Sequence, residues 1–130
     1  MAHELETNGD DATFASFREP AWHGLGTVFD HEVNTAEMLD LARLNHWNVR
    51  LEPVSELVPS YRFVRDTFMV VRDNPWDGEP DVLATVGERY KVLQNEDLFS
   101  FGDNILDGGG RWETAGSIKG GRQVFGSLAL

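Results

Sequence analysis

The stretch that decides the fold is residues 111–130, RWETAGSIKGGRQVFGSLAL. From residue 112 to residue 116 the side chains alternate in character, which is the period of a β-strand. The run KGGR at residues 119–122 then places two glycines before a second extended, apolar stretch. A Gly-Gly pair between two such segments is a strong hairpin signal, because glycine readily adopts the positive φ angles of tight turns. We therefore predict a hairpin whose second strand covers residues 123–130.

Two helices are predicted before this hairpin. The first covers residues 34–45, since Asn34 and Glu37 stand at the N-cap and N3 positions of a capping box and apolar residues follow at helical spacing. The second covers residues 95–107, with Asn95 as its cap and the triple glycine 108–110 as its end.

The segments between the helices carry strand patterns. Apolar and polar residues alternate over residues 47–52, and a longer extended region is predicted over residues 61–72. The sequence NPWDG at residues 74–78 indicates a hairpin tip, followed by a return strand over residues 82–86. The order helix, strands, helix, strands predicts an α+β fold with a mostly antiparallel sheet.

The N-terminal part divides into two predicted pieces. Residues 1–18 are polar and show little periodicity, so we expect a flexible acidic arm. Residues 19–130 are expected to form a single α+β domain. This domain opens with the run EPAWHGLGTVF at residues 19–29, which requires backbone turns at its glycines and docked side chains. We assign a structural motif to four of its residues: Trp22, His23, Gly24 and Gly26.

Composition restricts the classes of function. The 130 residues carry a net charge of −11 and no cysteine, which excludes disulfides and thiolate metal sites. No apolar run reaches the about 18 residues of a membrane span, so we expect a cytoplasmic protein without membrane contact. The charge is uneven, because residues 1–60 hold eleven acids against three arginines, whereas residues 108–130 hold one acid against three cations.

Catalytic and cofactor motifs are weak in this sequence. The histidines lack the spacing of a metal-binding helix, although His23 and His31 with Asp30 or Glu32 form the one alternative metal set. The glycines at 108–110 and 116–121 do not follow the strand-loop-helix order of a phosphate-binding loop. We therefore assign no metal, no cofactor and no catalytic residues, and we favour a non-enzyme over an enzyme centred on His23.

Aromatic residues interleaved with cations are the remaining signal. Single-stranded nucleic acids are held by stacking on aromatic rings combined with positive charge. The alternative is that the aromatic rings belong to the core and the cations to its rim. The candidate nucleic-acid-binding residues are Arg89, Tyr90, Lys91, Arg111, Trp112, Lys119 and Arg122.

Four motifs stand in order along the chain, MAHE at residues 1–4, PAWHGLGT at 20–27, VGERYKVLQN at 86–95 and ETAGSIKGGR at 113–122. Together they resemble the phage/plasmid-like protein family, a domain of unknown function found on phages and plasmids. The chain resembles the N-terminal half of a longer family architecture and departs from the family where Ala21 separates Pro20 from Trp22. The resemblance implies a phage- or plasmid-encoded protein in the host cytoplasm, and it supplies no catalytic residues.

Two classes of function stay open. The first is a non-enzymatic accessory protein that binds single-stranded nucleic acid in recombination or replication, with homo-oligomers formed through exposed strand edges. The second is an acidic interaction protein that binds a host protein, of a counter-defence or DNA-mimic type, which the net charge of −11 supports.

Overall fold

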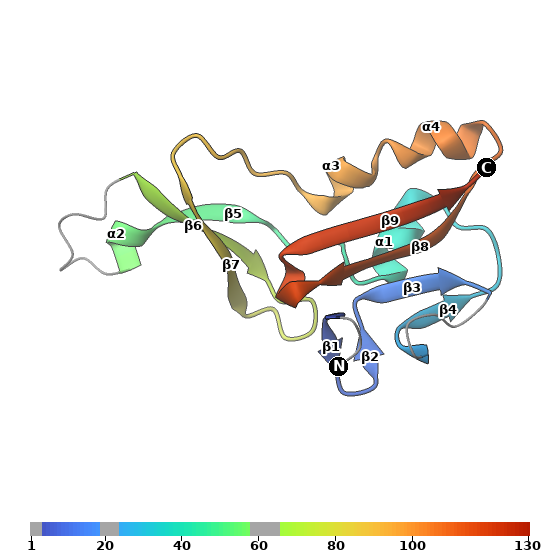
Figure 1. The fold of residues 1–130 in the computed structure, drawn as a ribbon, viewed down its shortest axis with the longest axis horizontal. Coiled ribbons are helices and arrows are strands. Elements are labelled where there is room, and N and C mark those ends of the chain that lie inside the picture. The colour runs from blue at the N-terminus through green and yellow to red at the C-terminus, as the bar shows by residue number, and fades with distance from the viewer. Residues whose placement is uncertain (1–3, 19–23, 58–65) are drawn as a thin grey trace. The chain divides into compact units, whose positions relative to one another are not determined.

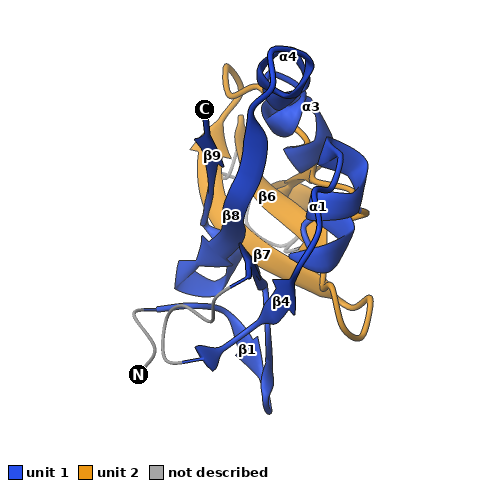
Figure 2. Ribbon diagram, turned by 90° about the vertical axis from the view of Figure 1, so that its right-hand side faces the viewer, with its two compact units in different colours: residues 1–45, 95–130 blue, residues 46–94 orange. Residues whose placement is uncertain are grey.

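A computed structural model of the chain describes residues 4–18, 24–57 and 66–130. Its strands and helices form an α+β fold with mostly antiparallel sheets, as predicted (Figure 1). The chain divides into two compact units, unit 1 from residues 1–45 and 95–130 and unit 2 from residues 46–94 (Figure 2). None of the helices in the described ranges is long and apolar enough to span a membrane.

Unit 1 contains strands β1 (Thr7–Asn8), β2 (Asp11–Ala12), β3 (Phe14–Phe17), β4 (Thr27–Phe29), β8 (Arg111–Ile118) and β9 (Gln123–Ala129). Its helices are α1 (Thr35–Leu41), α3 (Asn95–Phe99) and α4 (Gly102–Asp107), and the 3-10 turn η2 covers Lys119–Gly121. Unit 2 contains β5 (Arg50–Pro53), α2 (Val54–Leu57), β6 (Thr67–Asp73) and β7 (Pro80–Gly87).

The main sheet of unit 1 has the strand order β4-β3-β8-β9. Strands β8 and β9 form the predicted antiparallel hairpin, with Ile118 opposite Gln123 next to the turn. The turn takes left-handed φ angles at Lys119, Gly120 and Gly121, which explains the need for two glycines. Strand β3 pairs antiparallel with β8 and parallel with β4.

The prediction of a flexible arm over residues 1–18 is wrong for its second half. Residues 14–17 form β3, an inner strand of the sheet with every side chain buried. Phe14 joins Leu5 and Ala12 in an apolar cluster, and the buried Thr13 hydroxyl bonds to the hydroxyl of Ser117. The segment is polar on average, so its individual phenylalanines did not indicate a buried strand. The buried Thr13 hydroxyl is tolerated because it has a hydrogen-bond partner.

Gly26 belongs to the predicted structural motif and lies just before β4. Gly24 and Gly26 both have positive φ angles, of 75° and 84°, in agreement with the predicted turns. A Cβ on Gly26 would overlap the carbonyl oxygen of Phe14, so this position requires glycine for space as well as for conformation. The other two residues of the motif, Trp22 and His23, lie outside the described residues.

Helix α1 begins as predicted and ends earlier. The Asn34 side chain accepts a hydrogen bond from the Glu37 N–H at 2.8 Å, and the Glu37 carboxylate accepts one from the Asn34 N–H at 3.2 Å. This is the predicted capping box. The helix stops at Leu41 instead of residue 45 because Arg43 takes a left-handed φ of 58°, which reverses the chain direction.

The second predicted helix is two short helices, α3 and α4, separated at residues 100–101. Phe99, the last residue of α3, stacks on Trp112 of β8 with ring centroids 5.2 Å apart. Gly102, the first residue of α4, lies so close to the same indole that a Cβ would overlap its Cζ2 atom. The break lets both segments pack on one buried tryptophan.

The sheet of unit 2 is an antiparallel meander with the order β5-β6-β7. The predicted hairpin tip at residues 74–78 joins β6 to β7, and its Asn74 side chain accepts a hydrogen bond from the Trp76 N–H at 2.9 Å. Arg72 of β6 is 1% exposed; its guanidinium lies 4.3 Å from the centre of the Trp47 ring. Its Nε and Nη2 atoms both contact Asp81 Oδ2 at 3.0 Å. The buried Arg72 guanidinium therefore connects β6 to β7 within this unit.

Gly102→Ala is expected to destabilise the protein although alanine favours helix by about 1 kcal/mol over glycine. The added methyl group overlaps the Trp112 ring, and overpacking of this kind costs about 1–3 kcal/mol. Chemical denaturation measures the loss. Gly108→Ala is the matched control, since its Cβ would meet no atom closer than 3.6 Å; equal stability of the two variants would contradict the packing argument.

Arg72→Ala is expected to lower the free energy of unfolding by about 1.5–3 kcal/mol, because it removes a charged hydrogen bond to Asp81. Arg50→Ala is the control, since the Arg50 side chain is 31% exposed and pairs with Asp73 and Glu52 nearer the surface. Surface pairs contribute at most about 1 kcal/mol. Urea titrations of both variants test the difference, and a smaller loss for Arg72→Ala than for Arg50→Ala would refute it.

Candidate functional site

Trp112 is a core residue and not part of a binding surface. Its side chain is 1% exposed, with Phe99 stacked on the ring and Phe101 meeting it edge-on at 6.2 Å. A base cannot stack on a ring that is already covered. The structure therefore supports the core alternative for this residue, and the proposed nucleic-acid-binding set loses its largest aromatic ring.

Arg111 is engaged within unit 1. Its Nη2 atom pairs with the Glu113 carboxylate at 3.0 Å, and its guanidinium lies 5.3 Å from the Phe17 ring centre. It stands at the first residue of β8, whereas Lys119 and Arg122 lie beyond the last. At about 3.3 Å per residue, the eight-residue strand places Arg111 more than about 20 Å from the turn. The β8–β9 hairpin therefore does not gather its cations in one place.

Lys119 and Arg122 lie at the β8–β9 turn, and both are exposed. The remaining candidates, Arg89, Tyr90 and Lys91, are also exposed and follow β7 in unit 2. The Tyr90 N–H donates to the Gly87 carbonyl at 3.3 Å, which closes a tight turn under Tyr90, and 47% of the tyrosine is exposed. The exposed members of the predicted set thus form two groups, one in each compact unit.

Of the alternative metal set, only His31, Asp30 and Glu32 lie in the described part of the chain. His31 Nδ1 lies 3.2 Å from Asp30 Oδ1 on the surface, and no group of three potential ligands occurs among the residues described. His23 lies outside them. Within the same ranges we find no arrangement to which a catalytic role can be assigned from its contacts.

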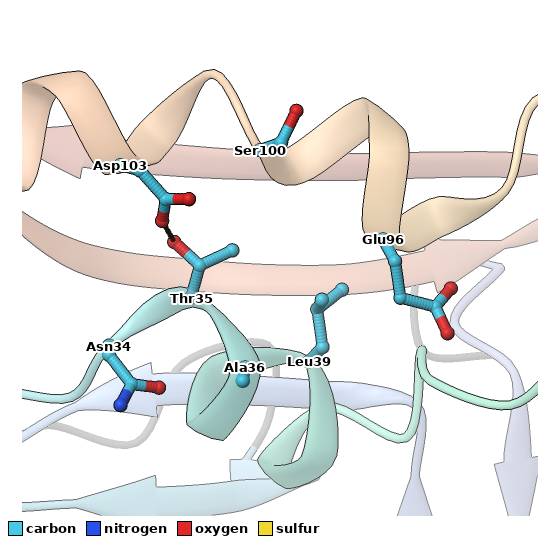
Figure 3. A pocket seen from close by; sticks show the side chains of 7 residues that line it. All are labelled: Asn34, Thr35, Ala36, Leu39, Glu96, Ser100 and Asp103. Carbon is cyan, nitrogen blue, oxygen red and sulfur yellow. Dashed lines mark hydrogen bonds between the residues drawn. The ribbon is translucent and has the colours of Figure 1, made fainter.

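A pocket that the sequence analysis did not predict lies between α1 and the α3–α4 segment of unit 1 (Figure 3). Its volume is about 330 Å³. Figure 3 shows the side chains of Thr35 and Asp103 pointing toward each other from opposite walls, whereas the Ser100 hydroxyl points away. The lining residues are Asn34, Thr35, Ala36, Leu39, Glu96, Ser100 and Asp103.

The polar side of this pocket is a chain of two hydrogen bonds. The Trp112 Nε1–H donates to Thr35 Oγ1 at 3.1 Å, and the Thr35 hydroxyl donates to Asp103 Oδ1 at 2.6 Å. An indole N–H can only donate, so Thr35 must accept from it and has its own proton available for Asp103. The direction of both hydrogen bonds follows from this constraint.

This arrangement presents a carboxylate of defined orientation beside the apolar side chains of Ala36 and Leu39. Glu96, from α3, adds a second carboxylate to the lining. Both carboxylates belong to exposed residues, so the pocket opens to solvent on its acidic side. The sequence did not reveal this pocket because its residues are far apart along the chain. Thr35 precedes Asp103 by 68 residues, Asp103 precedes Trp112 by 9, and neither spacing matches a motif.

Part of the chain matches a family of known sequences. Residues 82–128 are similar to the family described as "Domain of unknown function (DUF932)". The match lies in the C-terminal half of this chain and includes the motifs at residues 86–95 and 113–122. The predicted resemblance covers the whole chain and places it in the N-terminal half of a longer family architecture, so the matched position differs. Neither the curated proteins nor the solved structures contain a match.

Thr35→Val is expected to leave the buried Trp112 N–H without its acceptor, which costs about 1–3 kcal/mol. Thr35→Ser keeps the hydroxyl and loses one methyl group, worth about 0.8 kcal/mol. Hydrogen exchange of the Trp112 indole N–H, followed by NMR, should accelerate in Thr35→Val and stay close to wild type in Thr35→Ser. Unchanged exchange in Thr35→Val would show that the hydroxyl does not hold the indole.

Proposed function

We propose that this chain is a non-enzymatic phage or plasmid accessory protein that binds single-stranded nucleic acid in the cytoplasm of its host, in recombination or replication. The observation that carries the proposal is Tyr90, an exposed aromatic ring held on a tight turn between Arg89 and Lys91. A ring of this kind offers a face for a base, and the flanking cations offer charge for phosphates.

The proposed binding residues are fewer than the set predicted from sequence. They are Arg89, Tyr90 and Lys91 in unit 2 and, as a second group, the exposed Lys119 and Arg122 in unit 1, without Arg111 and Trp112. Both groups lie within the residues that match the domain of unknown function. The phage or plasmid origin is supported by the resemblance of the four sequence motifs.

The test is a titration of a fluorescently labelled oligothymidine of about 20 nucleotides, followed by anisotropy. Tyr90→Ala is expected to weaken binding by about 5- to 150-fold, because one stacked base is worth about 1–3 kcal/mol. Tyr90→Phe is the matched control and should bind like wild type, since it keeps the ring. Equal binding by Tyr90→Ala and wild type would contradict the stacking role.

The salt dependence of the same titration reports on the cations. Each phosphate contact contributes about 0.7 to the slope of log affinity against log salt for a single strand. The double variants Arg89→Glu with Lys91→Glu and Lys119→Glu with Arg122→Glu should each flatten this slope. Absence of binding at about 25 mM salt would remove the nucleic-acid proposal.

The second candidate function is an acidic interaction protein that binds a host protein. The net charge of −11 and the two carboxylates that line the pocket favour it. It predicts no oligonucleotide binding at low salt, which separates it from the first candidate.

The first proposal includes a homo-oligomer. Strand β9 lies at the edge of its sheet and carries no charged residue and no proline over Gln123–Ala129, the features that normally protect an exposed edge. Antiparallel pairing of two such edges would extend the sheet across a two-fold axis. A monomeric mass by light scattering at all concentrations would refute this part.

A further inference from the structure

We infer that Arg18 and Arg111 of unit 1 together bind a phosphate monoester, a dianionic group with three terminal oxygens. Both guanidinium groups lie over the ring of Phe17: the Arg18 Cζ atom is 4.6 Å from the ring centre and the Arg111 Cζ atom is 5.3 Å from it. Both distances fall within the about 6 Å of a cation–π contact. This inference does not depend on the nucleic-acid proposal, since it uses none of the residues proposed for that function.

The register of the sheet brings the two arginines together. Strand β3 ends at Phe17, and its antiparallel neighbour β8 begins at Arg111 (Figure 1). Ser16 is opposite Thr114 in this pairing, so the end of β3 lies beside the beginning of β8. Two positive charges that are distant in the sequence therefore share one end of the sheet.

The backbone of Arg18 directs its side chain to this place. Successive side chains of a strand point to opposite faces, so a continued strand would direct Arg18 away from the face of Phe17. Arg18 instead has a left-handed φ of 67°, and its guanidinium lies over the Phe17 ring. A left-handed φ is uncommon for a residue other than glycine, and such conformations are concentrated at functional positions that include ligand clamps.

The two guanidinium groups are incompletely paired. Arg111 donates from Nη2 to the Glu113 carboxylate at 3.0 Å, whereas its Nε–H is buried and has no acceptor. Arg18 is exposed, and the ion pairs in the described part of the chain involve other cations. Asp30, which follows β4, pairs with His31. An anion would supply the acceptors that these N–H groups lack.

Phe17 holds both groups in place. It is 8% exposed and packs on Phe29 of β4, with ring centroids 5.5 Å apart. Guanidinium groups stack on aromatic faces, so the fixed ring restricts the orientations of Arg18 and Arg111. Side chains that are ordered before binding lose less entropy when a ligand arrives.

The number of donors favours a phosphate monoester over other anions. A guanidinium binds the oxygens of a carboxylate or a phosphate through two parallel hydrogen bonds. One guanidinium therefore satisfies a carboxylate, and a phosphodiester within a nucleic-acid strand likewise has only two free oxygens and one charge. A phosphate monoester has three terminal oxygens and a charge of about −1.5 to −2, which matches two guanidinium groups.

The test is an NMR titration of the full chain with inorganic phosphate at about pH 8, where phosphate is mainly dianionic. In about 0.1 M sodium chloride the Debye length is about 10 Å, so distant acids are screened and direct contacts are not. The amide signals of Phe17, Arg18 and Arg111 should shift together and saturate. Acetate at the same ionic strength should bind about tenfold or more weakly. Absence of a saturating shift with phosphate, or an equal response to acetate, would overturn the inference.

Two variants should change the affinity in opposite directions. Arg18→Gln removes one guanidinium, so phosphate affinity should fall about tenfold or more, as expected for a charged hydrogen bond. Glu113→Gln releases Nη2 of Arg111 and should raise affinity about two- to fivefold, since exposed ion pairs are weak. Arg50→Gln in unit 2 is the charge-matched control and should bind like wild type. Full binding by Arg18→Gln, an equal loss in Arg50→Gln, or no gain in Glu113→Gln would exclude the arginine pair as the site.

Two further arms identify the source of the phosphate and separate the two proposals. If the ligand is the end of a nucleic-acid strand, an oligothymidine with a terminal phosphate should bind more tightly than one with a terminal hydroxyl, and Arg18→Gln should abolish this difference. Equal binding of the two oligonucleotides together with saturation by inorganic phosphate indicates a small phosphorylated molecule. Tyr90→Ala should leave phosphate binding unchanged, and Arg18→Gln should leave binding of the hydroxyl-ended oligonucleotide unchanged. Failure of either proposal is therefore visible without the other.

Discussion

A buried indole N–H must find an acceptor, and in unit 1 this need connects the sheet to the helices. Trp112 stands on β8 with 1% exposure, and Thr35 on α1 is its acceptor. An N–H left unpaired at such a position would cost about 1–3 kcal/mol, so α1 must present Thr35 at this point. The Thr35 hydroxyl donates its own proton to Asp103 on α4. One donor thus connects β8 and α4 with α1, which lies about 60 residues earlier in the chain.

The space around the same tryptophan is made by small residues. Gly102 allows α4 to approach the ring, and Gly126 on β9 leaves room for the rings of Phe99 and Trp112, which lie 3.0 Å from where its Cβ would be. Across β3, β8 and β9, the directly paired residues are Ala15, Ala115 and Gly126. Because these residues are small, large side chains can pack close to the sheet along this row. The pocket beside α1 is bounded by the helices that this packing holds in place.

The charges of the protein are distributed in a way that composition does not show. Several arginines pair with acids, as Arg43 does with Asp11 and Arg72 with Asp81, so part of their charge is neutralised within the protein. Lys91 and Lys119 are exposed, and they belong to different compact units. An overall charge of −11 therefore coexists with local basic groups.

Local signals in the sequence determined the start of α1, the glycine turn of the β8–β9 hairpin and the tip between β6 and β7, because caps and tight turns depend on residues within a few positions of one another. The sequence also indicated the α+β class. It could not show that residues 14–17 are an inner strand, that the second helix breaks before Gly102, or that Trp112 is covered. Each of these depends on partners ten or more residues away, as β3 depends on β8 and Trp112 on Thr35. The pocket likewise exists only in the tertiary structure, because Thr35 and Asp103 meet through the packing of α1 against the C-terminal helices and not through any spacing along the chain.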